Sequence, residues 1–328
     1  MNGSATVLVT SRSFSSGELD LVAELGAAGL TAVFGDHEHD LSRLAPILAQ
    51  AVGWIAGSGQ VTAAHLNAAP HMRIIARYGV GVDAVDLTAA AELGIVVTNS
   101  PGANTAAVAD HALALMLGVL RDLAVGDRRV RAGDWRVERT RQLGDLVVGI
   151  VGVGRIGRAV AARLGGFGSR MLGHDTGVSP AELTSLGIEP VSLAELARES
   201  DIVTLHIPGE RLLVDAAFLR QLKPRCMLIN TARATLVDEA AVASALQSGT
   251  LRRYAADTLG SDSAMTGNPL LTEPLADRTL FTPHAAAQTV EAVDRMGRGA
   301  VDAVLAVLRD EMPPNVVAAS RSAEQALP

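Results

Sequence analysis

Leu146-Val-Val-Gly-Ile-Val-Gly-Val-Gly-Arg-Ile-Gly157 joins an apolar run to a Gly-x-Gly-x-x-Gly turn, and an Ala-rich helical segment follows it. This order predicts a buried strand, a tight turn and a helix. Gly152 permits the turn, Gly154 lets the backbone approach a pyrophosphate, and Gly157 lets the helix pack closely on its strand. The phosphates would lie at the positive end of the helix dipole. The stretch therefore predicts a dinucleotide-binding α/β domain.

A carboxylate follows at the spacing that such a domain uses for the adenosine ribose. Asp175 lies 21 residues beyond Gly154 and ends the strand-like run 171–174. A carboxylate there accepts hydrogen bonds from the ribose hydroxyls, whereas a 2′-phosphate would meet a like charge, and no arginine follows immediately to offset it. The sequence therefore favours NAD as the cofactor. A solvated aspartate at a strand end is the alternative.

The composition is that of a globular protein with ample material for a core. The chain has 328 residues, of which 48% are hydrophobic and 19% charged, which predicts two domains. Its net charge of −7 argues against nucleic acid as the main partner, because phosphate binding needs excess Lys and Arg. The longest apolar stretch, 106–120, is interrupted by Asp110 and His111 and is shorter than the roughly 20 residues that cross a bilayer. We expect neither nucleic-acid nor membrane binding.

Cysteine content and the N-terminal residues indicate the compartment. The single cysteine, Cys226, excludes an intramolecular disulfide and clustered-thiolate metal sites, and its apolar neighbours 227–229 favour a small core residue over a reactive thiol. The first ten residues carry no basic side chain and do not resemble a signal peptide. We therefore expect a reducing, cytoplasmic location. No metal site is expected, because the histidines lack metal-ligand spacing.

Short apolar strands alternate with helical segments on both sides of the glycine turn. Ahead of it, strands are expected at 7–9, 31–34, 54–56, 74–76 and 95–97, and a helix at 18–28. After it, strands are expected at 202–205, 227–229, 253–256 and 280–281. This alternation predicts parallel sheets with helical crossovers in both halves.

The segment 288–309 reads as a helix with one buried face. Its apolar positions are Val290, Val293, Met296, Val301, Val304 and Leu305. Too little chain follows to build a core, so we expect this helix to pack back on the N-terminal domain, with 318–328 frayed. The predicted fold is α/β, with two Rossmann-like domains containing parallel sheets. A discontinuous substrate-binding domain, 1–101 and 288–328, is completed by the C-terminal helix, and 102–287 form the dinucleotide-binding domain.

Two neighbouring segments suggest contact surfaces. The stretch 107–120 is apolar nearly all round, which is typical of a helix buried in the fold or against a second subunit. The stretch 121–141 carries seven arginines among four acidic residues. Such mixed charge favours a solvated face or a subunit-contact arm, with an anion-binding patch as the alternative.

Polar residues that could do chemistry follow the expected strands downstream of the turn. They are Asn230-Thr-Ala-Arg233, Asp257, Asp262 and Thr282-Pro-His284. In an open α/β sheet, a dinucleotide and its substrate meet outside the carboxyl ends of the strands. Arg233 offers a planar fork that matches a carboxylate. His284 can pass a proton to or from a reacting oxygen, and a nearby carboxylate would stabilise its imidazolium.

With these residues in this order, the chain resembles the D-isomer-specific 2-hydroxyacid dehydrogenase family, which includes glyoxylate/hydroxypyruvate reductases and D-lactate and D-3-phosphoglycerate dehydrogenases. The resemblance covers 74–317. Beside the residues above, its motifs are Tyr78-Gly-Val-Gly-Val-Asp83, Thr98-Asn-Ser-Pro-Gly102, Ala109-Asp-His111 and His206-Ile-Pro208. It implies an NAD-dependent oxidoreductase that interconverts a small 2-oxo acid and its D-2-hydroxy acid by hydride transfer.

The resemblance also implies residue roles. His284 would protonate the carbonyl oxygen during reduction, and Asp262 would support it. The substrate would contact Tyr78, Val80, Gly81 and Arg233, with its carboxylate on the Val80 and Gly81 amides and the Arg233 guanidinium. The cofactor would contact Gly152, Gly154, Arg155, Ile156, Gly157, Asp175, His206, Ile207, Pro208, Thr231, Ala232, Arg233, Asp257, His284 and Ala286. His111 is expected to be a packed, hydrogen-bonded core histidine.

Two positions depart from the family pattern. Asp262 stands where the family usually has Glu, within an unusual loop, 261–267, and the missing methylene shortens its reach toward His284 by about 1.5 Å. Ala234 stands where the family commonly has Gly. A positive φ would strain Ala234, and a slightly different local turn is the alternative.

We expect a homodimer that reduces glyoxylate or hydroxypyruvate with NADH. A phosphorylated substrate would need extra cations near the carboxylate loop; Arg73 and Arg77 are the only candidates, and Gly57-Ser-Gly59 offers none. The alternatives on this scaffold are a D-3-phosphoglycerate dehydrogenase-like enzyme and a formate- or phosphite-oxidising enzyme. An NAD-sensing, corepressor-like binding protein is an alternative of another class, and the presence of both Arg233 and His284 argues against it.

Overall fold

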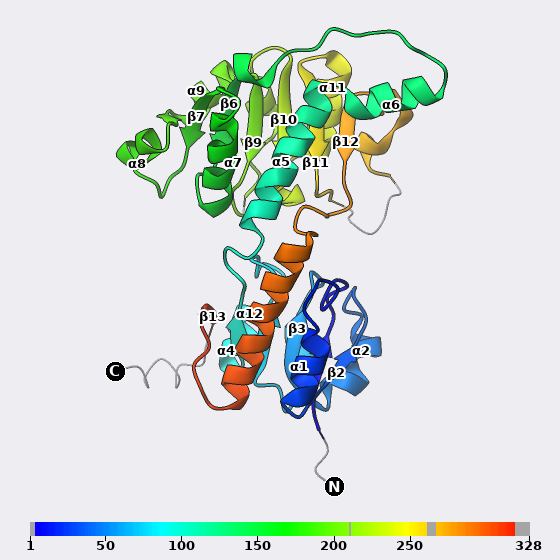
Figure 1. The fold of residues 1–328 in the computed structure, drawn as a ribbon, viewed down its shortest axis with the longest axis vertical. Coiled ribbons are helices and arrows are strands. Elements are labelled where there is room, and N and C mark those ends of the chain that lie inside the picture. The colour runs from blue at the N-terminus through cyan, green and yellow to red at the C-terminus, as the bar shows by residue number, and fades with distance from the viewer. Residues whose placement is uncertain (1–3, 210, 261–266, 319–328) are drawn as a thin grey trace. The chain divides into compact units, whose positions relative to one another are not determined.

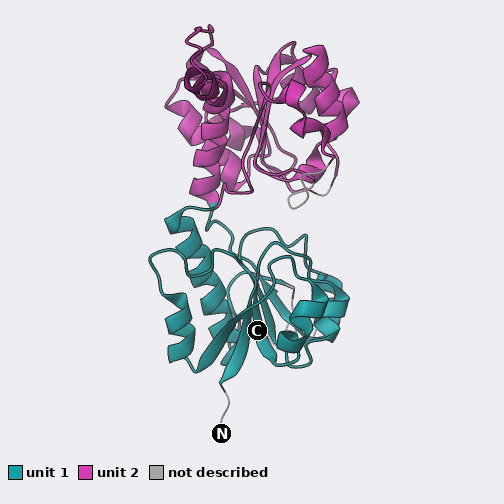
Figure 2. Ribbon diagram, turned by 90° about the vertical axis from the view of Figure 1, so that its right-hand side faces the viewer, with its two compact units in different colours: residues 1–104, 288–328 teal, residues 105–287 magenta. Residues whose placement is uncertain are grey.

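The computed structural model describes residues 4–209, 211–260 and 267–318, and the chain forms two compact units. Residues 1–104 and 288–328 make up the first unit, and residues 105–287 the second (Figure 2). The chain first passes from one unit to the other between residues 104 and 105, three residues later than the expected boundary between 101 and 102. The chain returns because α12 (Val290–Leu308) packs on the sheet of the first unit, which confirms the expected discontinuous arrangement.

The first unit contains a six-stranded sheet in the order β13-β5-β4-β3-β1-β2. Its strands are β1 (Ala5–Val9), β2 (Leu30–Phe34), β3 (Ala51–Ala56), β4 (Ile74–Arg77), β5 (Val96–Thr98) and β13 (Val316–Ala318). The five strands from β1 to β5 are parallel and correspond to the five expected segments.

The sixth strand adds one antiparallel pair to this otherwise parallel sheet. β13 runs antiparallel to β5, with Val316 opposite Thr98. The strand forms because the chain turns back after α12 and reaches the open edge of β5. A pairing of three residues carries no periodic signal of its own, which is why the sequence did not reveal it. Residue 318, expected to begin the frayed end, belongs to this strand.

Helices cover both faces of this sheet. They are α1 (Leu21–Ala27), α2 (Leu41–Leu48), α3 (Ala63–Asn67), α4 (Leu87–Glu92) and α12 (Figure 1). Residues of α2, α3 and α4 share one core with the sheet, including Leu44, Leu66 and the fully buried Trp54. α12 packs on β3 and β4 through the expected apolar face, except that Val290, at its first position, is exposed and Leu305 is only half-buried.

The second unit contains a fully parallel sheet in the order β12-β11-β10-β9-β6-β7-β8. Its strands are β6 (Val147–Val151), β7 (Arg170–His174), β8 (Glu189–Pro190), β9 (Ile202–Leu205), β10 (Cys226–Asn230), β11 (Leu251–Ala256) and β12 (Thr279–Phe281). The order reverses between β6 and β9, the switch point at which doubly wound sheets bind ligands. The structure thus confirms the expected α/β fold class.

Helices on the two faces of this sheet enclose two separate cores. The helices are α5 (Thr105–Leu120), α6 (Leu123–Arg131), α7 (Arg155–Gly165), α8 (Pro180–Ser185), α9 (Leu193–Glu199), α10 (Ala216–Leu219) and α11 (Glu239–Ser248). Single 3₁₀ turns lie at Leu143–Asp145, Ala234–Leu236, Pro269–Leu271 and Glu273–Leu275. α5 and α7 lie side by side on one face (Figure 1), and α9, α10 and α11 share the other core. α5 therefore buries its apolar surface inside the fold of its own unit.

Within the described ranges, none of the helices combines the length and the apolar character needed to cross a lipid bilayer. Cys226 is buried at the start of β10, in agreement with its interpretation as a core residue.

A glycine in β6 tests the close packing of α9 on the sheet. A Cβ atom at Gly149 would clash with Ser200 Oγ and lie 2.6 Å from Leu196 Cδ2. We predict that Gly149→Ala lowers the free energy of unfolding by about 1–3 kcal/mol, the usual range for overpacking. Gly26→Ala, in α1, is the control, because a Cβ there meets nothing within 4 Å, and replacing a helical Gly by Ala stabilises by up to about 1 kcal/mol. Equal stabilities of the two variants in denaturant unfolding would contradict the packing described here.

Candidate functional site

Polar residues gather at one edge of the parallel sheet in the second unit. Because the strands run in the same direction, their carboxyl ends share that edge. The glycine turn follows β6, His206 follows β9, Arg233 follows β10, Asp257 follows β11 and His284 follows β12. The structure therefore brings together predicted residues that are up to 132 positions apart in the sequence, from Gly152 to His284.

The glycine turn leaves no room for side chains at two of its three glycines. Gly152 has a φ of +87°, and a Cβ on it would lie 2.6 Å from the carbonyl oxygen of His206. A Cβ on Gly157 would clash with the Gly152 oxygen. At Gly154, by contrast, a Cβ would meet no atom within 4 Å. This glycine thus faces open space at the N-terminus of α7, where a ligand can approach the backbone.

Asp175 lies beside this turn, at the end of β7. Its carboxylate accepts hydrogen bonds from the amides of Val153, at 2.6 Å, and Gly177, at 2.7 Å. Each carboxylate oxygen has a further acceptor position, which suits a ribose hydroxyl. The unpaired amides that begin α7 at Arg155 suit a pyrophosphate. The cradle and the acceptor together fit a dinucleotide.

The structure adds Arg158, which the sequence analysis did not single out, to this neighbourhood. Its Nε donates to the carbonyl oxygen of Val153 at 3.0 Å, and its guanidinium forms an ion pair with Glu182 at 2.8 Å. The same residue, Val153, is thus bound by Asp175 through its amide and by Arg158 through its carbonyl. The spacing between Val153 and Arg158 in the glycine motif is the only sequence signal for this contact.

Hydrogen bonds link the ends of three neighbouring strands into a chain. The His284 amide donates to the Asp257 carbonyl at 2.9 Å, and the Asp257 amide donates to the Asn230 carbonyl at 3.0 Å. The side-chain amide of Asn230 donates to the Arg233 carbonyl at 2.8 Å and accepts from the amide of Ala232. The backbones of His284 and Arg233 are therefore held in one continuous network.

Asp257 is buried, with 1% of its surface exposed. Its carboxylate accepts hydrogen bonds from the Thr282 hydroxyl at 2.5 Å and from the amides of Ala285 and Ala286 at 2.8 Å. Burial alone would raise the pKa of Asp257, but these bonds, together with one from His111, keep the pKa below its usual value. The carboxylate is therefore charged at neutral pH and holds the loop that carries His284 and Ala286.

His284 adopts a left-handed backbone conformation, with a φ of +53°. A non-glycine residue pays about 1–2 kcal/mol for this conformation and keeps it only when its surroundings impose it. The Asp257 network supplies that constraint, because it binds the amides of three successive residues from 284 to 286.

Arg233 precedes the 3₁₀ turn Ala234–Leu236 and has an extended backbone. A Cβ on Gly209, in the loop after β9, would lie 2.6 Å from Arg233 Cβ and Cγ, so this glycine makes room for the arginine side chain. Ala234 does not have a positive φ, so the strain considered for this position does not arise.

His206 is a neutral residue at this edge. Its Nε2 lies 3.0 Å from the Thr204 hydroxyl, and burial lowers the pKa of His206 to about 4. The ring is therefore uncharged at neutral pH and does not act as a general acid. Ile207 and Pro208 continue the same loop past Gly152.

The loop 78–81 of the first unit has its carbonyl groups occupied by donors. Arg77 donates to the Tyr78 carbonyl at 2.5 Å, the Ser100 amide to Gly79 at 2.8 Å, and the Asn99 side chain to Val80 at 2.7 Å. Among the hydrogen bonds of the described residues, the amides of Val80 and Gly81 donate none. Consecutive unpaired amides of this kind form an anion-binding concavity.

The side chain of Tyr78 is buried and bonded to α12. It is 6% exposed, and its hydroxyl donates to the Val293 carbonyl in α12 at 3.1 Å. Burial raises the pKa of Tyr78 to about 12. The Tyr78 amide donates to the Ala56 carbonyl at 3.0 Å and its carbonyl accepts from Arg77, so its backbone groups are also engaged within the protein.

Three other sequence expectations concern Asp262, Arg73 and metal binding. Asp262 lies outside the described residues. Arg73 does not supply a cation to the loop 78–81, because it precedes β4 and forms an ion pair with Asp310 at 2.5 Å. No group of three or more metal-ligating side chains occurs within the described ranges.

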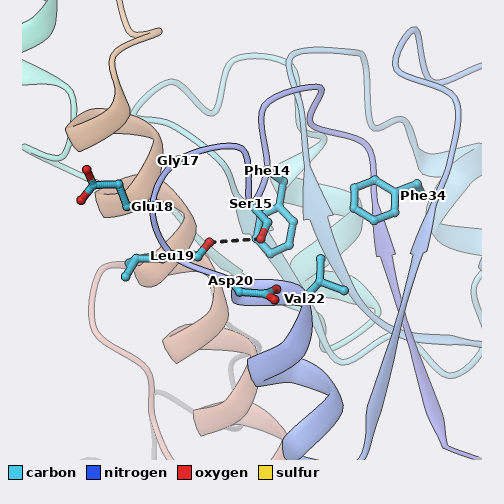
Figure 3. A pocket seen from close by; sticks show the side chains of 8 residues that line it. All are labelled: Phe14, Ser15, Gly17, Glu18, Leu19, Asp20, Val22 and Phe34. Carbon is cyan, nitrogen blue, oxygen red and sulfur yellow. Dashed lines mark hydrogen bonds between the residues drawn. The ribbon is translucent and has the colours of Figure 1, made fainter.

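A separate surface hollow of about 370 Å³ lies in the first unit, between the loop 14–20 and the end of β2 (Figure 3). Its lining includes Phe14, Leu19 and Phe34 and none of the predicted site residues. The hollow is therefore distinct from the residues that the sequence analysis assigns to chemistry.

Comparison with known proteins shows which family this chain resembles. Residues 113–286 match the family model described as D-isomer specific 2-hydroxyacid dehydrogenase, NAD binding domain. The chain is 36% identical to D-3-phosphoglycerate dehydrogenase of Mycobacterium leprae over 317 residues, 90% of this chain but only 58% of that relative. It is 38% identical to glyoxylate reductase of Korarchaeum cryptofilum, with 76% of this chain and 77% of that protein aligned.

A solved structure agrees over the whole fold. The TT0316 protein of Thermus thermophilus superposes with a TM-score of 0.85 at 35% identity, covering 95% of this chain and 99% of that one. The matched model spans more than half of the chain and contains the glycine turn, Asp175, Arg233, Asp257 and His284. The chain therefore belongs to the D-isomer specific 2-hydroxyacid dehydrogenase family, and residues 113–286 form its NAD-binding domain.

Proposed function

We propose that this protein uses NADH to reduce a small, unphosphorylated 2-oxo acid to the D-2-hydroxy acid, and catalyses the reverse reaction with NAD. The observation that carries the proposal is the hydrogen-bonded chain that holds the backbones of Arg233 and His284 at the edge beside the glycine turn. An arginine fork and an imidazole held at the carboxyl edge of a nucleotide-binding sheet suit carboxylate binding and proton transfer.

Each residue has a separate role in the proposed reaction. The Arg233 guanidinium holds the substrate carboxylate, and the amides of Val80 and Gly81 bind its oxygens. The protonated His284 ring donates a proton to the carbonyl oxygen as that oxygen gains negative charge. When bound, NADH supplies the hydride that reaches the carbonyl carbon. In the oxidative direction, the neutral His284 ring takes the hydroxyl proton back.

The other residues of the NAD-binding domain position the cofactor. Asp175 binds the adenosine ribose, and the amides of Arg155 and Ile156 bind the pyrophosphate. The loops that follow β9, β10 and β12, with Ile207, Thr231 and Ala286, line the nicotinamide end. Asp262 is proposed as the acid that supports His284.

The preference for an unphosphorylated substrate rests on the charges of the first unit. The loop Gly57-Ser-Gly59 after β3 carries no charged side chain. Arg77 donates from Nη1 to the backbone oxygens of Ala56 and Tyr78, and Arg12 forms an ion pair with Glu38 at 2.7 Å. Arg77, at the end of β4, and Arg12, after β1, are thus engaged with the protein, whereas a phosphate needs donors directed at it.

Turnover of small acids tests the proposed activity. We predict that the purified chain oxidises NADH with glyoxylate or hydroxypyruvate, with a kcat/KM at least tenfold above that for 3-phosphohydroxypyruvate. The measurement is the loss of NADH absorbance, repeated with NADPH, pyruvate and bulkier oxo acids. Oxidation of formate or phosphite without turnover of any 2-oxo acid would replace the proposed substrate class. NADH binding without any turnover would favour a corepressor-like sensor.

The carboxylate role of Arg233 is tested separately from cofactor binding. We predict that Arg233→Lys lowers kcat/KM for the oxo acid by about 10- to 100-fold, because a hydrogen bond to a charged group is worth about 1.5–3 kcal/mol and lysine lacks the planar fork. The dissociation constant of NADH, measured by fluorescence titration, should stay the same. Arg220→Lys, at the exposed end of α10, is the matched control. An Arg233→Lys variant with weaker NADH binding and an unchanged oxo-acid KM would assign this arginine to the cofactor instead.

We also propose that the protein is a homodimer formed through α6 and the segment 132–142. Trp135 is 77% exposed and Val137 is 91% exposed on this segment. Its arginines are largely paired with acids of the same unit, including Arg129 with Glu138 and Arg136 with Asp134. Apolar side chains between neutralised charges suit a protein interface better than an anion site.

The oligomeric state tests the dimer. We predict that light scattering on a sizing column gives the mass of two chains, and that a Trp135→Asp, Val137→Asp double variant gives the mass of one. The paired control replaces two exposed apolar residues elsewhere, Phe34→Asp and Leu93→Asp, and should leave the dimer intact. A monomeric natural chain at micromolar concentration would refute this part of the proposal.

A further inference from the structure

His111 contacts the loop that carries His284, although it belongs to a distant part of the chain. It lies on α5, and its Nε2 is 2.8 Å from the Thr282 hydroxyl and 3.5 Å from Asp257 Oδ1. The Thr282 hydroxyl donates its proton to Asp257 at 2.5 Å, so its lone pair accepts from Nε2–H of His111. His111 is thus hydrogen-bonded, as expected, but its side chain is 22% exposed and its partners belong to the candidate site.

The hydrogen bonds that begin at His111 continue to the backbone of His284, the proposed general acid. Asp257, which accepts from Thr282, also accepts from the amides of Ala285 and Ala286, and its carbonyl accepts from the amide of His284. His111, Thr282 and Asp257 therefore form a hydrogen-bonded relay that ends on the amides of residues 284 to 286. The first of these, His284, has the left-handed conformation. A small displacement of such a residue is costly for catalysis, because misplacing a reacting group by about 1 Å can cost 10²-fold in rate.

Asp257 needs its partners because it is a buried charge. Among the described side chains that can carry a positive charge, His111 is the one that lies within 4 Å of this carboxylate, with its Nε2 3.5 Å from Oδ1. β10 contributes Asn230 and the end of β12 contributes Thr282, and neither of these side chains titrates. Among the described residues, the titratable side chain in contact with Asp257 is His111, from α5, and His284 lies on the loop that Asp257 holds through backbone bonds. Without His111, the ionised form of Asp257 loses a stabilising donor and protonates at a higher pH.

The relay also connects the two ends of the NAD-binding unit. The chain enters this unit at Thr105, where α5 begins, and leaves it after Ala287, just beyond the loop 282–286. His111 lies on the second turn of the entering helix, and Thr282 lies at the start of the leaving loop. Side-chain hydrogen bonds thus join the two segments through which the chain crosses between its units.

We propose that His111 is a positioning residue, which fixes His284 for proton transfer through the Thr282 hydroxyl and the Asp257 carboxylate. The inference rests on the proposed function for the role of His284, but the positioning itself is a property of the loop. It does not require His111 to touch the substrate or the cofactor.

Substitutions that keep or remove the donor separate positioning from packing. His111→Leu fills similar space without a donor, and His111→Gln keeps an N–H near the position of Nε2. Thr282→Val removes the hydroxyl that links the relay, and Thr282→Ser retains it. His71→Leu, at an exposed position of the first unit, is the matched histidine control.

We expect His111→Leu and Thr282→Val each to lower kcat at neutral pH by about tenfold or more, and the double variant to lose little further, because both break the same relay. His111→Gln, Thr282→Ser and His71→Leu should stay within about threefold of the natural chain. The kcat of His111→Leu should also fall at a higher pH on the acid side than that of the natural chain. The reason is that a protonated Asp257 no longer accepts from all of its donors. A purely structural defect would lower kcat equally at every pH.

Hydrogen–deuterium exchange provides a readout that does not depend on activity. We expect faster exchange of the amides of 284–286 in His111→Leu than in His111→Gln or the natural chain. If the natural chain reduces no 2-oxo acid but this difference is seen, the proposed function fails and the positioning stands. Unchanged exchange in His111→Leu, or equal losses of kcat in the Leu and Gln variants, would overturn the inference.

Discussion

The Asp257 carboxylate accepts hydrogen bonds from the Thr282 hydroxyl and from two successive backbone amides, and it does so where almost no solvent reaches. The same residue uses its backbone amide and carbonyl to join Asn230 and His284. Each buried amide left without a partner would cost about 1–3 kcal/mol. One residue at the end of β11 thereby holds the loops that follow β10 and β12, and with them the backbones of Arg233 and His284. The chemistry proposed for this protein depends on that constraint.

The parallel sheet explains why a single carboxylate can have this effect. In β10, β11 and β12 the carboxyl ends lie next to one another, so loops far apart in sequence become neighbours. The first unit uses a related arrangement with backbone groups only. There, Arg77, Asn99 and Ser100 hold the carbonyls of the loop 78–80, and the following amides are available to an anion. Binding by backbone amides places no demand on the side chains of Val80 and Gly81, which accords with a small substrate.

The sequence predicted the features that local patterns encode. The apolar runs marked the strands from β1 to β7 and from β9 to β12. The glycine turn with Asp175 marked the nucleotide cradle, because turn geometry restricts which residues fit. β8 and β13 were missed, since two or three residues have no periodicity. The contacts of His111 and Arg158 were missed for other reasons. His111 joins α5 to a strand end that is distant in the sequence, and that meeting depends on how the helix packs on the sheet. The Arg158 contact is local, five residues from Val153, but no residue pattern around the turn marks it. The apolar surroundings of His111 in the sequence pointed to a core residue and gave no sign of Thr282.

The most direct test of this account is a crystal structure of the protein with NADH and oxamate, an unreactive analogue of a small 2-oxo acid. The account predicts that the Arg233 guanidinium binds the oxamate carboxylate and that the His284 ring donates to its carbonyl oxygen, with the cofactor pyrophosphate on the glycine turn. Oxamate bound away from either side chain, or a cofactor bound away from Gly154 and Asp175, would contradict it.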